Sequence, residues 1–410
     1  RENTMSRLFA VCAVTAVILS SRATAETQVN VRTSGAQAGS AIAADPRGGA
    51  VVVWSSYFSS GGRSNDIIAR RIDAAGVPTG EEFPVNSINQ GSQTEPAAAI
   101  DALGNLAIVW QSPGSDEDVL LRMYDPHRIP VTGDLLVNMR TEGRQIYPCV
   151  AAGPGTFLVA WESRETTVYG DQAFICAQEF DPNGAGLGGE ILVDPDIYDC
   201  RYPDAAMDAR GNFVVTWMRD RSSHPIMARL FGPDGTPRTD LFAVNTESVA
   251  SVTRPSIAMN SQGWFLIAWD GDPNRAANDD IHARLYDPNG VPRGEPFVVN
   301  AIRDGAQQWP QAALNEANEF VIVWEYDAGD PNEGADIYAR RFAADGRPLG
   351  EESRLNTYTA DRQRYAEIAA TADGSFYAVW ESNGQDGSGY GVFLHAEHRR
   401  NPTDPNALSE

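Results

Sequence analysis

The sequence predicts an all-β protein, a seven-bladed β-propeller of four-stranded antiparallel blades. The main observation is a tryptophan that returns every 51 to 56 residues at the end of an apolar run. Self-similarity at a fixed period of this kind is the signature of propellers and other repeat folds. The same landmarks also follow one another in the same order around each tryptophan. The seven repeats are marked by Trp54, Trp110, Trp161, Trp217, Trp269, Trp324 and Trp380.

The first half of each repeat predicts two strands. A proline opens a short alanine-rich run, as at Pro96, Pro203 and Pro310. Proline has no backbone N–H to donate, so it is tolerated at the first residue of a strand and poorly inside one. A glycine turn follows, such as Ala-Leu-Gly-Asn at 102–105. The β-branched run that then ends at the tryptophan is typical of a buried strand.

The second half of each repeat predicts two more strands. Runs such as 66–72, 280–286 and 336–342 alternate apolar and polar residues, which is typical of a strand with one buried face. Turns such as Asp-Pro-Asn-Gly at 287–290 follow them and indicate hairpins. The fourth strand then ends in Val-Asn or a close variant, at Asn86, Asn138, Asp194, Asn245, Asn300 and Asn356.

The two ends of the repeat array predict how the ring closes. The last repeat has a third strand at 391–397, but no hairpin and no fourth strand follow it. Residues 27–32 carry the Val-Asn signature ahead of the first repeat. We therefore predict that this N-terminal strand pairs with the last blade, which removes an exposed sheet edge. The propeller would span 26–398, followed by a flexible tail at 399–410.

The first 25 residues differ in kind from the repeats. After four upstream residues, Met5 is followed by an apolar stretch from Leu8 to Leu19 and by Ala-Thr-Ala at 23–25. This pattern is typical of a secretory signal peptide, so we expect a secreted or periplasmic product. No other stretch is long and apolar enough to span a bilayer. We expect a soluble monomer.

The charge of the chain argues against a nucleic-acid partner. The net charge is −23, and removing residues 1–25 would change it to −25. A polyanion would be repelled over much of such a surface, and the sequence has no basic stripe with interleaved aromatic residues. With 42% hydrophobic residues the chain can bury a sizeable core. In a propeller that core is divided into layers between neighbouring blades.

Three cysteines follow the predicted signal peptide: Cys149, Cys176 and Cys200. All three map to one end of neighbouring blades, and an exported protein folds where disulfides form. Two interpretations stay open. One is a disulfide between Cys200 and one of the others, which leaves an odd thiol. The other is three small buried side chains.

One end of the propeller is predicted to carry the function. The connections between blades and the loops after the tryptophans emerge together there, and variable loops are where binding residues gather. The residue before each strand-opening proline should ring the channel mouth, where aromatic rings can stack on a sugar and arginines can donate hydrogen bonds. The alternative is that these side chains pack over the blade tops. The residues concerned are Glu95, Tyr147, Tyr202, Arg254, Trp309 and Tyr365, with Arg144, Arg201 and Arg364 as further donors.

An acidic loop after Trp269 suggests a calcium site. Its oxygen-bearing residues alternate with a glycine, as hard cations prefer. The twelve-residue spacing with a terminal glutamate is missing, so a solvated acidic loop is the alternative. The five histidines show no metal-ligand spacing. The candidate ligands are Asp270, Asp272, Asn274, Asp279 and Asp280.

Residues that return in nearly every blade are interpreted as structural. An arginine holds the same third-strand position in five blades, and a catalytic group would be needed only once. We expect these arginines to bind acidic residues or carbonyls of neighbouring strands. We expect the Val-Asn asparagines to satisfy backbone groups between blades. The arginines are Arg70, Arg122, Arg229, Arg284 and Arg340.

The repeat also resembles a known group of proteins. The unit reads Pro-x-x-Ala, then Gly-x-Phe-Val-Val-x-Trp, Asp-Ile-x-Ala-Arg-x-Phe-Asp and Gly-x-Pro-x-Gly with a final Val-Asn. It is similar, over residues 27–398, to a repeat of exported bacterial β-propeller proteins. The resemblance implies the propeller fold and export, and it assigns no activity.

Two functions remain open. The main interpretation is an exported, non-catalytic propeller that binds a carbohydrate or a surface protein, with no catalytic residue assigned. The alternative is a glycan-acting hydrolase that uses carboxylates at the mouth of the channel. Two carboxylates facing each other in a deep pocket would favour the hydrolase. A channel lined by the alanine-rich strands alone would favour binding.

Overall fold

The computed structural model describes most of the chain. Most of the predicted signal peptide and the whole predicted tail lie outside the described residues. The described ranges are 22–23, 26–58, 64–88, 90–113, 116–167, 170–196, 199–220, 225–245, 254–271, 279–329, 334–372 and 374–398.

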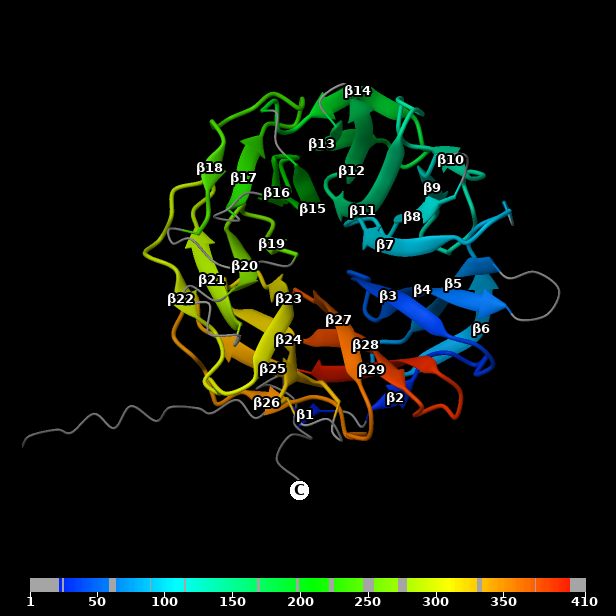
Figure 1. The fold of residues 1–410 in the computed structure, drawn as a ribbon, viewed down its shortest axis with the longest axis vertical. Helices are drawn as coiled ribbons and strands as arrows, with labels where there is room; N and C mark the ends of the chain where they lie inside the picture. Colours follow the sequence, from blue (N-terminus) through cyan, green and yellow to red (C-terminus); the bar gives the residue numbers. More distant parts are fainter. Residues whose placement is uncertain are drawn as a thin grey trace, which may run out of the picture.

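Seven antiparallel sheets stand in a ring, so the predicted seven-bladed propeller is confirmed (Figure 1). The first strand of each blade lies nearest the axis and the fourth lies at the periphery. The blades are numbered in chain order. Blade 1 consists of β3 (Gln37–Ala44), β4 (Ala50–Phe58), β5 (Ser64–Ile72) and β6 (Pro78–Pro84), and blade 2 consists of β7 (Thr94–Ile100), β8 (Leu106–Ser112), β9 (Asp118–Tyr124) and β10 (Leu135–Leu136). Blade 3 consists of β11 (Arg144–Ala152), β12 (Phe157–Thr167), β13 (Gly170–Phe180) and β14 (Gly186–Leu192).

The remaining blades repeat this order, and the last one takes its outer strands from the N-terminus. Blade 4 consists of β15 (Cys200–Met207), β16 (Phe213–Arg219), β17 (Ile226–Phe231) and β18 (Phe242–Ala243), and blade 5 consists of β19 (Ser256–Met259), β20 (Phe265–Gly271), β21 (Asp280–Tyr286) and β22 (Phe297–Val298). Blade 6 consists of β23 (Ala306–Leu314), β24 (Phe320–Asp327), β25 (Asp336–Phe342) and β26 (Ser353–Arg354). Blade 7 consists of β27 (Gln363–Ala370), β28 (Phe376–Asn383) and β29 (Tyr390–His398), together with β2 (Thr27–Gln28) and β1 (Arg22–Ala23).

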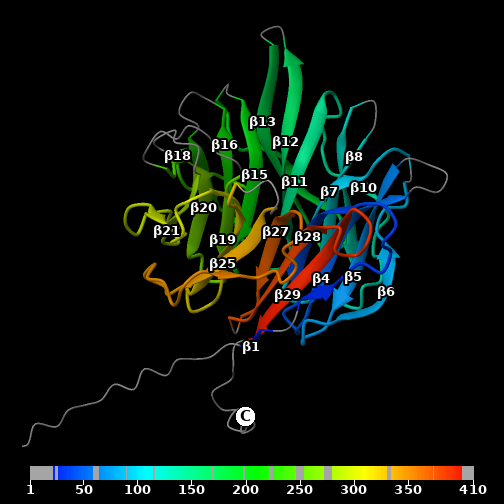
Figure 2. The same ribbon diagram turned by 60° about the horizontal axis from the view of Figure 1, so that its bottom comes forward.

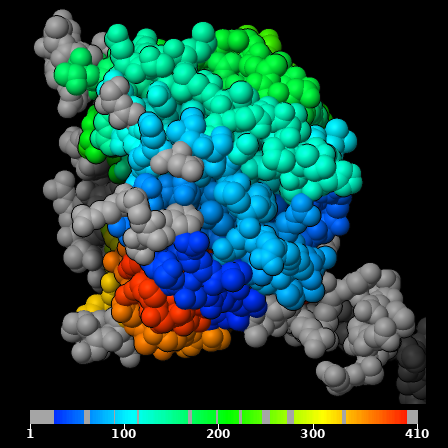
Figure 3. Space-filling model, turned by 90° about the vertical axis from the view of Figure 1, so that its right-hand side faces the viewer, coloured from blue at the N-terminus to red at the C-terminus, as the bar shows by residue number. Residues whose placement is uncertain are grey.

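The N-terminal strand closes the ring, as predicted. Thr27 pairs with Leu394 in the register of β2 and β29. The pairing continues beyond β2, because the Val29 N–H donates to the Val392 carbonyl at 2.8 Å. The Val392 N–H in turn donates to Oδ1 of Asn30 at 2.8 Å. Figure 3 shows the N-terminal segment in blue lying beside the C-terminal strands in red.

The core lies in seven layers between neighbouring blades, and each contains one of the repeat tryptophans. In the layer between blades 7 and 1, Trp54 packs with Val379 and Leu394. Its buried indole N–H donates to Oε1 of Gln37 at 3.0 Å. A buried indole needs such a partner. The same bond returns in Trp110–Gln93, Trp161–Gln145 and Trp324–Gln307, whereas Trp217 donates to Asp194.

The repeated arginines are structural, and their partners are backbone carbonyls. Nη1 of Arg340 donates to the Val299 carbonyl of the preceding blade at 2.8 Å, and Nε donates to the Gly350 carbonyl of its own blade at 3.2 Å. Each arginine therefore ties its third strand to the end of the preceding blade. The equivalent bonds to the preceding blade are Arg70 to Val29, Arg122 to Val85, Arg229 to Val193 and Arg284 to Val244.

The Val-Asn asparagines satisfy backbone groups at the same junctions. Oδ1 of Asn300 accepts from the Ile281 N–H at 2.8 Å, and its amide donates to the Ile302 carbonyl at 2.7 Å. The amide also donates to Asp280 at 2.7 Å. These bonds hold the third strand against the chain that leaves for the next blade, as the sequence predicts.

The predicted disulfide is wrong, because Cys149, Cys176 and Cys200 are all free. Cys176 lies in the layer between blades 2 and 3, on the opposite side of blade 3 from the layer that contains Cys200. Cys200 belongs to the layer between blades 3 and 4, and its thiol donates to Asp194 at 3.2 Å. The three cysteines are therefore small packing residues.

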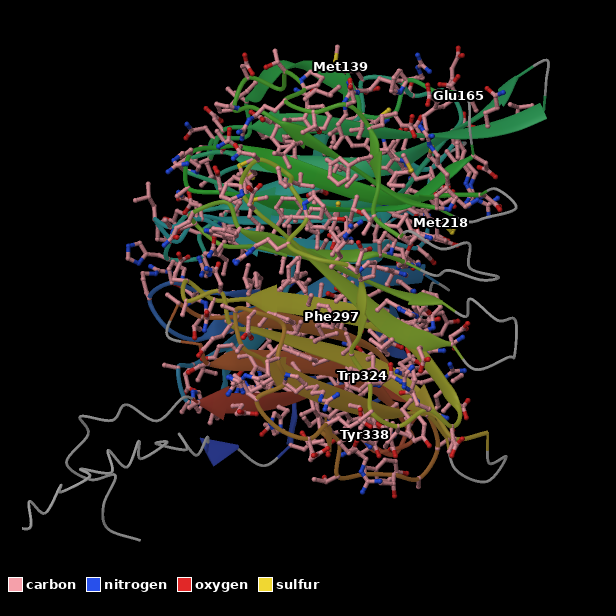
Figure 4. All side chains as sticks on the ribbon, turned by 90° about the vertical axis from the view of Figure 1, so that its left-hand side faces the viewer. Met139, Glu165, Met218, Phe297, Trp324 and Tyr338 are labelled. Atoms are coloured by element: carbon pink, nitrogen blue, oxygen red, sulfur yellow. The ribbon has the colours of Figure 1, made fainter. Side chains whose placement is uncertain are left out.

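The faces of the ring differ. The hairpin of β12 and β13 reaches beyond its neighbours in Figure 2. In the side view of Figure 4, Glu165 and Met218 lie toward the face from which this hairpin extends, whereas Phe297, on the outer strand β22, lies between the two faces. Glu165 and Met218 follow Trp161 and Trp217, so the ends of the second strands reach that face.

Within the described ranges, no helix is long and apolar enough to cross a membrane.

Candidate functional site

In six of the seven blades, a β-bulge near the start of the first strand places one residue at the wall of a cavity on the ring axis. In blade 3 the pairing with β12 shifts register between Ile146 and Cys149, and Tyr147 has a φ of 52°. Positive φ is uncommon for residues other than glycine, and bulges re-aim side chains beside functional sites. The other bulge residues with positive φ are Gly39, Glu95, Tyr202, Trp309 and Tyr365.

These bulge residues, together with Arg254 at the same position of blade 5, form what we call the collar. The collar surrounds a cavity of about 390 Å³ on the ring axis. Gly39 is the one collar position without a side chain. The collar residues are Gly39, Glu95, Tyr147, Tyr202, Arg254, Trp309 and Tyr365, and all of them line the cavity.

Buried glutamates hold three of the bulges in place. Oε2 of Glu162 accepts from the Tyr202 N–H at 3.2 Å, and Oε1 of Glu325 accepts from the Tyr365 N–H at 2.6 Å. Glu381 accepts from the Gly39 N–H in the same way. Each glutamate directly follows a repeat tryptophan of the preceding blade. The sequence analysis missed this role, although a glutamate after Trp161, Trp324 and Trp380 was a visible signal.

The aromatic side chains of the collar contact one another and Arg254. The rings of Tyr147 and Tyr202 meet edge-on with centroids 5.0 Å apart, and those of Trp309 and Tyr365 do so at 5.3 Å. The Arg254 guanidinium lies 4.7 Å from the Tyr147 ring centre and forms an ion pair with Glu95 at 3.3 Å. The side chains of the collar therefore support one another. Tyr365 nevertheless keeps 40% of its surface exposed.

Arg364 lies beside the collar and donates a hydrogen bond to a buried carboxyl group. Its Nε donates to Oε2 of Glu381 at 2.9 Å, and its guanidinium stacks on Tyr390 with 3.7 Å to the ring centre. Glu381 is fully buried. Burial raises the pKa of Glu381 to about 7, and the charge of Arg364 partly offsets that rise. Arg364 therefore lines the cavity with its Nε bound to Glu381 and its guanidinium stacked on Tyr390.

Four carboxyl groups line the cavity, those of Glu95, Glu381, Asp204 and Glu367. Asp204 on β15 and Glu367 on β27 each lie two residues after a collar residue, in blades three apart around the ring. Most of the equivalent positions carry small residues, such as Ala41 and Ala97. The channel is therefore not lined by small side chains alone. The sequence analysis missed both residues, although a spacing of two along a strand from the collar would have found them.

The environments of the carboxyl groups of Asp204 and Glu367 separate their pKa values. Burial raises the pKa of Asp204 to about 6, although the Ile257 and Ala205 N–H groups donate to it at 2.8 Å. Burial and the neighbouring charge of Asp204 raise the pKa of Glu367 to about 8. The pKa of Glu367 therefore lies above that of Asp204, so Glu367 keeps its proton to higher pH than Asp204 does. A difference in pKa of this kind allows one site to contain both a general acid and a general base.

Two of the predicted donors lie elsewhere. Arg144 and Arg201 are not among the described residues that line the cavity. Arg144 forms an ion pair with Glu117. Arg201 pairs with Asp199 at 2.6 Å and Asp220 at 3.1 Å. Ligand binding by Tyr147, Tyr202, Arg254, Trp309, Tyr365 and Arg364 stays a prediction that their positions allow.

The predicted calcium loop is only partly covered. Asp272 and Asn274 lie outside the described residues. Asp270 is buried, Oδ1 of Asp280 accepts from Asn300, and Oδ2 of Asp279 accepts from Gln308 at 3.1 Å. The part of the chain that the structure describes holds no group of three acidic, histidine or cysteine side chains fit to bind a metal. The calcium site stays a prediction.

Comparison with known proteins adds the fold alone. No protein-family model and no curated protein matches the sequence. Among solved structures, a protein of unknown function from Dyadobacter fermentans aligns over 93% of this chain and 99% of its own, at 12% identity and a TM-score of 0.55. An α-L-arabinanase of Penicillium chrysogenum in complex with arabinobiose aligns over 73% and 92%, at 13% identity and a TM-score of 0.51. An α-L-arabinofuranosidase of Fusarium graminearum, in complex with an iminosugar inhibitor, aligns over 74% and 92%, at 12% identity and a TM-score of 0.50.

Proposed function

We propose that this protein hydrolyses a glycosidic bond in the cavity beneath the collar. The observation that carries the proposal is the pair of carboxyl groups, Asp204 and Glu367, in one cavity on the ring axis with pKa values of about 6 and about 8. Glycoside hydrolases pair a protonated carboxylic acid with an ionised carboxylate on either side of the scissile bond. This favours the hydrolase over the non-catalytic binding propeller.

The proposed chemistry assigns each carboxyl group one role. Glu367 donates its proton to the glycosidic oxygen as the C–O bond breaks. Asp204 takes a proton from a water molecule whose oxygen forms the new bond to the anomeric carbon. We propose single displacement with inversion, in which that water lies between the two carboxyl groups. The aromatic rings of the collar supply faces on which sugar rings stack.

The fold neighbours support this proposal through their shared architecture. Two proteins with this propeller fold are described as an arabinanase and an arabinofuranosidase, so the architecture accommodates glycan hydrolysis. Neither neighbour identifies the sugar for this chain, since identities of 12 to 13% carry the fold only. The site chemistry therefore carries the argument.

A glycan array followed by hydrolysis assays tests the proposal. The purified chain is applied to the array, and every glycan retained is then incubated with the protein while released reducing ends are measured. We expect retention of at least one glycan class and release of product from it. Retention without release would support the non-catalytic binding propeller, and no retention of any glycan would exclude both carbohydrate functions.

A further inference from the structure

The guanidinium of Arg254 occupies an aromatic cage formed by the collar. Its central carbon lies 4.7 Å from the ring centre of Tyr147, 5.0 Å from that of Tyr202 and 5.5 Å from that of Trp309. A cation within about 6 Å of an aromatic ring centre is attracted by the ring face. The collar thus already accommodates a cation, and this cation belongs to the protein itself.

Acidic groups surround the cage. Glu95 pairs with Arg254 at 3.3 Å, and Asp204 and Glu367 line the same cavity. The other cavity arginine, Arg364, is engaged by Glu381 at 2.9 Å. Without Arg254 the aromatic faces would remain, with the carboxylates of Glu95 and Asp204 in the same cavity, and this combination suits an ammonium or guanidinium ligand. The net charge of −23 also favours the approach of cations.

Arg254 is held weakly enough to be displaced. Its side chain is 35% exposed and that of Glu95 is 39% exposed. Ion pairs with this exposure contribute little stability, because water screens them and both long side chains lose freedom. A ligand cation that enters the cage regains the ring contacts that Arg254 gives up. The exchange therefore costs little beyond moving one flexible side chain.

We propose that Arg254 is a displaceable occupant of this cage, and that the cage takes the ammonium group of an amino sugar. The preferred substrates would then be cationic glycans built from glucosamine-type units. The choice of a sugar over a lysine- or arginine-bearing peptide rests on the proposed glycoside hydrolysis. An acidic sugar would instead need Arg254 as its partner and would reverse every expectation below.

Calorimetric titration with glucosamine oligosaccharides and their N-acetylated counterparts tests the inference, because acetylation removes the charge and keeps the linkage. We expect the amino oligosaccharide to bind the wild-type chain more tightly than the acetylated one. Arg254→Ala should tighten amino-sugar binding about tenfold, roughly 1.4 kcal/mol, by freeing the cage. Arg254→Lys keeps the internal cation and should bind like the wild type. Trp309→Ala removes one cage wall and should weaken binding.

The outcomes separate this inference from the proposed catalysis. Weaker binding by Arg254→Ala, at an unchanged melting temperature, would overturn the inference, as would equal binding of the two oligosaccharides. A lysine-rich peptide that binds while amino sugars do not would also overturn it. Hydrolysis of neutral glycans alone would overturn the inference and leave the hydrolase standing. Tight amino-sugar binding without hydrolysis would support the cage and contradict the catalysis.

Discussion

Oε1 of Glu325 in blade 6 accepts a hydrogen bond of 2.6 Å from the backbone N–H of Tyr365 in blade 7. The donor lies in a bulge with a φ of 50°, so a buried acid of one blade holds the unusual backbone of the next. Backbone strain of this kind persists only where its surroundings over-determine it, and it gathers at functional sites. The collar geometry therefore depends on side chains outside the collar.

Removing that acceptor should cost stability. In Glu325→Ala the partly buried Tyr365 N–H loses its partner, and Arg362 loses its ion pair. We expect the free energy of unfolding in urea to fall by about 1 to 3 kcal/mol, the usual cost of an unsatisfied buried donor. Glu325→Gln keeps an acceptor and should lose less. Glu351→Ala, an exposed glutamate of the same blade, is the control, and equal stability of all three variants would contradict the bracing role.

Filling the gap in the collar should block the cavity. Gly39 has a φ of 63°, close to that of the other collar residues, and an added Cβ would find its nearest neighbour, Cδ of Pro96, at 3.5 Å. Gly39→Tyr should therefore fold, at a cost of about 1 to 2 kcal/mol for the left-handed backbone. We expect glycan binding to fall at least about tenfold as the ring narrows. Undiminished binding would show that ligands do not enter through the collar.

Ring closure should depend on Asn30. The Val392 N–H donates to Oδ1 of Asn30, which is 3% exposed. Asn30→Ala should lower the free energy of unfolding by about 1 to 3 kcal/mol, and deletion of residues 26–32 should cause aggregation by exposing the edge of β29. Val31→Ala, at the exposed neighbour of Asn30, should have little effect. A deleted chain that melts like the wild type and elutes as a monomer would contradict closure by this segment.

The buried carboxyl of Glu367 should make stability depend on pH. Its folded-state pKa of about 8 lies above the ordinary value of 4.5. The stability that this group contributes is complete below pH 4.5 and is lost as the pH rises to about 8, because the folded protein then has to hold a buried charge. Glu367→Gln should therefore melt higher than the wild type at pH 9 and alike at pH 4. Identical melting curves at pH 9 would contradict the raised pKa.

Repetition explains which features could be predicted from the sequence. The blade number, the ring closure and the structural arginines each rest on residues that return in most repeats. The collar was predictable for the same reason, since its members share one place before a strand-opening proline. Asp204 and Glu367 each occur in one blade only, at a position where most other blades carry a small residue. A search for residues that recur in every repeat therefore does not find them. The disulfide interpretation failed because position along the chain does not reveal that Cys176 lies in the layer between blades 2 and 3, whereas Cys200 lies in the layer between blades 3 and 4.

The pH profile of glycan hydrolysis tests the central claim most directly. With Asp204 as the base and Glu367 as the acid, kcat/KM should rise through a pKa near 6 and fall through one near 8, provided that the assay uses a glycan retained on the array. Glu367→Gln should lower the rate by about 10² to 10⁴ and abolish the upper limb, and Asp204→Asn should abolish the lower one. Both variants should keep binding the glycan. Hydrolysis that survives both substitutions with an unchanged profile would show that these two carboxyl groups are not the catalytic pair.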